Sequence, residues 1–135
     1  MNTINQLNYK IKELKSFAAS ANFEVKISLD QYPISVKFYE QQVDLFSEEV
    51  TDTAPTICFI LNEEMSIVTS DNFKTNEAVF NKMKKLSKDI DILYLRTFRE
   101  KVGEFLGSLK QDDFEDPLSI KRYIEVIMRE LIDLS

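Results

Sequence analysis

Hydrophobic residues at the start of the chain recur at alternating spacings of three and four. Such spacing places them on one face of an α-helix, with charged residues such as Lys12 on the opposite face. The members of the row are Ile4, Leu7, Ile11, Leu14 and Ala18. The pattern therefore predicts an amphipathic helix over residues 3–20.

From Phe23 onward the hydrophobic period changes to two, which is typical of strands with one buried face. The alternating apolar residues are Phe23, Val25, Ile27 and Leu29, and then Ile34, Val36 and Phe38. Between the two groups, residues 30–33 end in Pro33, which fixes φ and has no backbone donor for a ladder. We therefore expect two antiparallel strands joined by a turn.

Further strands are expected before residue 70. Residues 40–47 extend the second strand or form a short third one, and residues 47–55 form a loop. Residues 56–61 are apolar at both alternating sets of positions, which predicts a central strand with Phe59 and Ile60 buried under different layers. Residues 65–69 are expected to form the last strand.

After residue 72 the hydrophobic period returns to that of a helix. One stripe runs from Val79 to Ile90, and a second runs from Tyr94 to Leu109. Asp89 either caps a new helix or lies within a continuous one, so helices over 73–88 and 89–109 and a single long helix both remain open. Asp116 and Pro117 suit the N-cap and first position of a last helix.

The order of elements is thus a helix, four or five antiparallel strands, and two or three C-terminal helices. Strands that precede helices, instead of alternating with them, indicate an α+β fold. We expect one domain over residues 1–135. Within it, residues 1–88 form a helix, the sheet and a further helix, and residues 89–135 form a C-terminal helical hairpin.

The composition excludes several classes of function but does not identify one. The 135 residues are 44% hydrophobic and 30% charged, with no histidine and one cysteine. Without histidine, most zinc sites and all His-based catalytic triads are excluded. The only glycines are Gly103 and Gly107, so glycine-rich phosphate loops are excluded as well. Cys58 lies in an apolar run and is expected to be a buried structural thiol. We expect no enzyme activity, no cofactor and no metal.

The chain is expected to be cytoplasmic and not bound to a membrane. Its N-terminus is polar and unlike a signal peptide. The longest apolar run is about five residues, against the roughly 20 needed to span a bilayer.

Charge is distributed unevenly along the sequence. The net charge is −6, which argues against nucleic acid and favours a basic protein surface as partner. No lysine or arginine occurs between Lys37 and Lys74. That stretch holds eight acidic residues: Glu40, Asp44, Glu48, Glu49, Asp52, Glu63, Glu64 and Asp71. They are predicted to form one negative face of the sheet that binds a partner, and the alternative is that they only keep the protein soluble.

The two glycines suggest a second contact surface. Gly103 and Gly107 share one helix face, and each costs the helix about 1 kcal/mol relative to alanine. They are predicted to allow close approach of another helix, unless Gly107 simply ends the helix. The last helix is also apolar over more than one stripe, which favours a homodimer. The predicted self-association residues are Gly103, Gly107, Ile120, Ile124, Ile127 and Leu131.

The leading hypothesis is a small, acidic, non-enzymatic protein-interaction module. It would serve as an inhibitor, an immunity-type protein or an assembly factor of a phage or other mobile element. The alternative is a nucleic-acid-binding regulator that uses the lysine-rich helix over residues 75–88. Its lysines are Lys82, Lys84, Lys85 and Lys88. A solvated polar face is the favoured explanation of them, because no aromatic, asparagine or glutamine reader lies among the lysines.

Overall fold

The computed structural model of the chain describes residues 2–40, 55–70, 73–74, 76–108 and 117–134. It confirms the predicted α+β fold, with an N-terminal helix, an antiparallel sheet and two C-terminal helices. In chain order the elements are α1 (Thr3–Ser20), β1 (Phe23–Ser28), β2 (Ser35–Glu40), β3 (Ile57–Ile60), β4 (Ser66–Thr69), α2 (Glu77–Ser108) and α3 (Pro117–Ile132).

Both ends of α1 are determined by asparagines. The side chain of Asn2 accepts a hydrogen bond from the backbone N–H of Asn5 at 2.9 Å, which is the interaction of a helix N-cap. After the last turn, Asn22 takes a left-handed backbone conformation with φ of 66°. Asparagine tolerates this conformation better than most residues other than glycine. The chain therefore leaves the helix here and enters β1 one residue later.

The sheet has four strands in the order β1-β2-β3-β4, and each neighbouring pair is antiparallel. The turn predicted at residues 30–33 joins β1 to β2. The segment over 41–47, predicted to extend the second strand or form a third, lies outside the described residues. In the register, Val36 is opposite Phe59 and Phe38 is opposite Ile57. These four side chains are fully buried on one face of the sheet.

Aromatic rings join this buried face to the helices. Phe38 meets Phe23 and Phe59 edge-to-face, with ring centroids 6.4 and 5.5 Å apart. Phe59 meets Phe80 of α2 in the same way at 5.7 Å. Such pairs contribute about 0.5–1.5 kcal/mol beyond the area that they bury. The core therefore lies between this face of the sheet and the pair α1 and α2.

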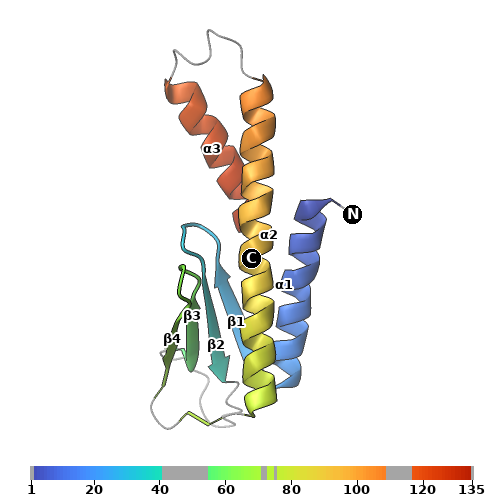
Figure 1. Cartoon of the computed structure of the whole chain (residues 1–135), viewed down its shortest axis with the longest axis vertical. Coiled ribbons are helices and arrows are strands. Elements are labelled where there is room, and N and C mark those ends of the chain that lie inside the picture. Colours follow the sequence, from blue (N-terminus) through green and yellow to red (C-terminus); the bar gives the residue numbers. More distant parts are fainter. Residues whose placement is uncertain (1, 41–54, 71–72, 75, 109–116, 135) are drawn as a thin grey trace, which may run out of the picture.

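The other face of the sheet is not covered by any described helix (Figure 1). Cys58 and Ile60 of β3 are only half-buried, and Val68 of β4 is 59% exposed. The predictions of a buried Cys58 and a buried Ile60 under a second layer are therefore wrong. Phe59 is fully buried, as predicted.

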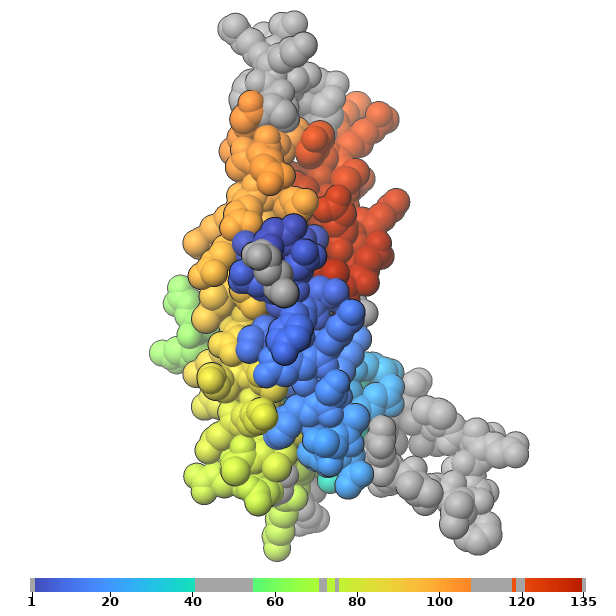
Figure 2. All heavy atoms as spheres, turned by 90° about the vertical axis from the view of Figure 1, so that its right-hand side faces the viewer, coloured from blue at the N-terminus to red at the C-terminus, as the bar shows by residue number. Residues whose placement is uncertain are grey.

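Helix α2 is one continuous helix of 32 residues. It passes through Asp89 without a break, so a new helix does not begin there, and the boundary expected at 88–89 falls inside α2. Its first half packs against α1 and the sheet (Figure 1). Its second half extends beyond both and is accompanied by α3, which runs antiparallel to it (Figures 1 and 2).

Helix α3 begins at Pro117, the position at which a proline costs a helix least. Asp116, its predicted cap, lies outside the described residues. The rings of Phe105 and Tyr123 stack between α2 and α3 with centroids 4.0 Å apart. The hydroxyl of Tyr94 donates to the carbonyl oxygen of Leu29 at 3.3 Å, which joins the middle of α2 to the end of β1.

Candidate protein-interaction surfaces

The predicted acidic face is only partly visible in the structure. Glu40, Glu63 and Glu64 are exposed. The other five acidic residues, Asp44, Glu48, Glu49, Asp52 and Asp71, lie outside the described residues. The backbone N–H of Glu40 donates to Thr56, just before β3 begins, at 3.3 Å. Glu63 and Glu64 instead follow the end of β3. The structure therefore places the three described carboxylates at opposite ends of that strand.

The uncovered face of the sheet carries positive charge among its described residues. Lys26 of β1 is directly opposite Lys37 of β2 in the register. The Lys26 ammonium lies over the ring of Tyr39, 5.2 Å from its centroid, where the ring offsets part of this charge repulsion. Glu24 pairs with Tyr39 on the same face. The described part of this face is thus of mixed charge and not uniformly negative.

The four lysines of α2 form two groups that differ in their surroundings. The Lys82 ammonium lies 4.6 Å from the ring centroid of Phe17 on α1, and Lys84 is half-buried. Lys85 and Lys88 are exposed on the outward side. Because α2 continues without a break, further exposed residues follow on the same side at helical spacing. We call this surface the basic face of α2; it consists of Lys85, Lys88, Ile92, Arg96 and Arg99.

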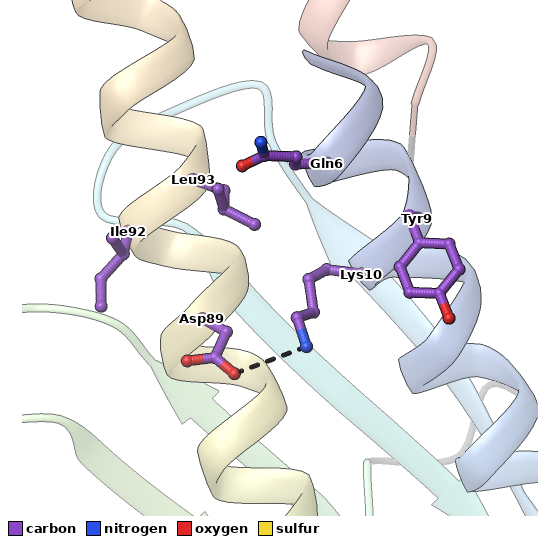
Figure 3. A pocket seen from close by; sticks show the side chains of 6 residues that line it. All are labelled: Gln6, Tyr9, Lys10, Asp89, Ile92 and Leu93. Carbon is purple, nitrogen blue, oxygen red and sulfur yellow. Dashed lines mark ion pairs between the residues drawn. The ribbon is translucent and has the colours of Figure 1, made fainter. Parts of the chain in front are cut away.

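A groove lies beside the basic face, between α1 and α2 (Figure 3). Its volume is about 400 Å³. It is lined by Gln6, Tyr9, Lys10, Asp89, Ile92 and Leu93. The Lys10 ammonium lies 3.8 Å from the Asp89 carboxylate and 3.2 Å from that of Glu13, so this one cation is paired with two carboxylates. The side chains of Tyr9 and Ile92 are more than half exposed, at 61% and 54%. The groove is therefore suited to apolar contact.

The free end of the α2–α3 hairpin exposes apolar side chains. Val102 and Leu106 follow each other at a spacing of four on α2, as do Ile124, Met128 and Ile132 on α3. The ion pair between Lys101 and Glu130, at 3.5 Å, marks one edge of the contact between the helices. Helical geometry places both apolar rows on the opposite edge. We call these five residues the hairpin patch.

Three members of the hairpin patch are clearly exposed. Leu106 is 52% exposed, Ile124 is 40% and Ile132 is 38%. The remaining two, Val102 and Met128, are half-buried between these side chains and the core. The patch therefore combines three exposed and two half-buried apolar side chains on one edge of the hairpin.

The predicted self-association residues do not lie on one surface of the structure. Ile127 and Leu131 are buried in the core of the chain itself, at 3% and 0% exposure, so a second copy cannot contact them. Ile124 is exposed, and the side chain of Ile120 lies outside the described residues. A single interface that contains the whole predicted set is therefore wrong.

The glycines lie on a different surface from α3. Gly103 and Gly107 are exposed, and a Cβ added at either position would meet nothing within 4 Å. No other part of the described chain approaches them closely. Neither glycine has a positive φ, and α2 continues to Ser108, so Gly107 does not end the helix.

One buried carboxylate was not anticipated from the sequence. Asp91 lies four residues after Ser87 on α2, and one oxygen of each side chain is buried with no hydrogen-bond partner among the described residues. Burial raises the pKa of Asp91 above its usual value. The pKa of Tyr94 is also raised, mainly by burial and further by the charges of Asp30 and Asp91. The signal available in the sequence was its place beside Ile90 and four residues before Leu95, within the apolar part of α2.

The described residues do not provide a cluster of metal ligands. Within them, no three His, Cys, Asp or Glu side chains are grouped so that they could hold a metal ion. No helix in the described part of the chain combines the length and the apolar character needed to cross a membrane. Comparison with protein-family models, curated proteins and solved structures finds no match to this chain.

Proposed function

We propose that the chain is a non-enzymatic protein-interaction module and that it pairs with a second copy through the hairpin patch. The exposed large hydrophobic residues of the described chain support this. Six of these eleven lie between residues 106 and 132, and three of the six, Leu106, Ile124 and Ile132, belong to the hairpin patch. A gathering of exposed apolar side chains at one end of a molecule is typical of an interaction site.

A second copy fits the hairpin patch for two reasons. Two helical hairpins related by a two-fold axis form a four-helix bundle, in which each patch covers the other. Charges beside the patch are also self-complementary, because Lys121 and Glu125 are both exposed next to Ile124 on α3. A two-fold axis brings the lysine of one copy toward the glutamate of the other, which favours this pairing over a parallel alignment.

An inhibitor, an immunity-type protein and an assembly factor all act by binding another protein, so a dimeric module is compatible with each of them. A basic protein surface stays the predicted partner of the acidic residues. In the described chain its contact would involve Glu63 and Glu64, which are adjacent on an exposed turn.

Co-purification of two differently tagged copies of the chain tests the self-pairing. We expect capture through one tag to retain the copy that carries the other tag. The double variant Leu106→Glu with Ile124→Glu should abolish retention, because it places charge in the apolar contact. The matched control is Val68→Glu with Tyr9→Glu, which adds the same charge at exposed apolar positions elsewhere. Retention by the hairpin variant, or loss in the control alone, would overturn the proposed interface.

A further inference from the structure

We propose that the basic face of α2 and the adjoining groove bind an acidic amphipathic helix of a partner protein. This surface lies on the outward side of α2 and borders the hairpin patch only at Arg99, which lies three residues before Val102. The inference therefore goes beyond self-pairing and can fail or hold independently of it.

The charges of the basic face are arranged symmetrically about one apolar residue. Lys88 and Arg96 lie four residues before and after Ile92, and Lys85 and Arg99 lie seven before and after it. All four are exposed, and none takes part in an ion pair within the described chain. At 1.5 Å per residue the face is about 21 Å long, the length of four helical turns. A partner helix with glutamates at the same spacings would pair with all four charges.

The groove supplies an apolar anchor at the centre of this face. Ile92 of α2 is 54% exposed at one margin of the groove and Tyr9 of α1 lies at the other, with Leu93 and the ion pair between Lys10 and Asp89 lying between them (Figure 3). Ile92 therefore gives the basic face an exposed apolar residue between its positive charges. It suits a partner whose acidic residues flank an apolar one, because an amphipathic helix presents such residues on one side.

A protein helix fits this surface better than a nucleic acid does. Asp89 and Glu13 lie beside the groove with Lys10, and their carboxylates would repel phosphates. The chain as a whole has a net charge of −6, which opposes the approach of a polyanion. A short acidic helix places its charges only along the basic face.

Fluorescence anisotropy with a labelled synthetic peptide tests the proposal on the full-length chain. The peptide is helical, with a central leucine and glutamates four and seven residues to either side. A control peptide has the same composition, with the glutamates distributed around the helix. Lys88→Glu with Arg96→Glu reverses the basic face, and Lys12→Glu with Lys15→Glu is the matched control at exposed lysines of α1. Ile92→Ser tests the anchor without a change of charge.

We expect the patterned peptide to bind more tightly than the control peptide. Reversal of Lys88 and Arg96 should weaken binding about tenfold, Ile92→Ser should weaken it as well, and the α1 control should leave it unchanged. Equal binding of both peptides, or equal loss in the α1 control, would overturn the proposal. So would tighter binding of a labelled DNA duplex that is lost on reversal of Lys88 and Arg96, because the surface would then serve a nucleic acid.

Discussion

Phe59 makes edge-to-face contacts with rings on both sides of it, Phe38 in the sheet and Phe80 on α2. It is fully buried, so truncation leaves a cavity that the surrounding rings cannot fill. We expect Phe59→Ala to lower the free energy of unfolding by about 3–5 kcal/mol, as measured by urea denaturation. Ile60→Ala is the neighbouring control and should cost clearly less, because Ile60 lies half-buried on the uncovered face. Equal losses for the two variants would contradict the one-sided sheet.

Asp91 should make the stability of the protein depend on pH. Burial raises its pKa in the folded state, so its contribution is most favourable below the ordinary value of 3.8 and is lost as pH rises through the folded-state pKa. Asp91→Asn should therefore stabilise the protein at neutral pH and have little effect in strong acid. Thermal unfolding across pH measures this difference.

Asp89→Asn is the matched control for that experiment. Asp89 is half-buried on the same helix, but its carboxylate interacts with Lys10. Its replacement removes an attractive partner, so no gain in stability is expected at neutral pH. A gain at Asp89 equal to that at Asp91 would show that burial of Asp91 is not the cause.

The predicted environment of single residues was correct on one face of the sheet only. Phe38, in a strand of alternating apolar and polar residues, and Phe59, in a strand apolar on both faces, are buried as predicted, because α1 and α2 cover their side of the sheet. Cys58 and Ile60 are equally apolar in sequence, but no described helix covers them. A hydrophobic pattern specifies which side chains share a face, and it does not specify whether a second layer exists.

At the scale of the helices, Gly103 provides the clearest test. It lies inside α2 with helical backbone geometry, and an added Cβ would meet nothing within 4 Å. We expect Gly103→Ala to raise the free energy of unfolding by about 0.5–1 kcal/mol. Gly107→Ala should give less, because Gly107 is one residue from the end of α2. A loss of stability in Gly103→Ala would reveal a close contact at this position.

The boundaries of an element could be predicted where residues close to them in sequence determine them. The helix over 3–20 was predicted with the bounds that the structure has, because its apolar spacing of three and four changes to alternation at Phe23, and Asn2 and Asn22 mark its two ends in the structure. The sequence left open whether residues 73–109 form one helix or two. An aspartate such as Asp89 suits an N-cap and also an exposed position inside a helix. Its carboxylate meets Lys10 on α1 instead, a contact between elements that no local pattern contains.

At the scale of the whole molecule, the surfaces were the least predictable feature. Counting charges along the sequence suggested one acidic face, yet Glu40 and Glu63 lie at opposite ends of β3. Four basic side chains instead gather along the outward side of α2. A strand between two residues can place them at opposite ends of the sheet even when they are near in sequence. A continuous helix can bring residues many positions apart onto one side of the molecule. The same holds for the apolar stripe of α3: the sequence could not show that Ile127 and Leu131 would be buried in the chain's own core and would not lie at the surface.

Sedimentation equilibrium at micromolar concentration tests the central claim most directly. We expect the intact chain to sediment at twice its mass of 15.8 kDa, and Leu106→Glu with Ile124→Glu to sediment as a monomer. Gly103→Leu should remain a dimer, because Gly103 is exposed on α2 but outside the hairpin patch. A monomeric intact chain, or a hairpin variant that still forms dimers, would contradict pairing through the hairpin patch.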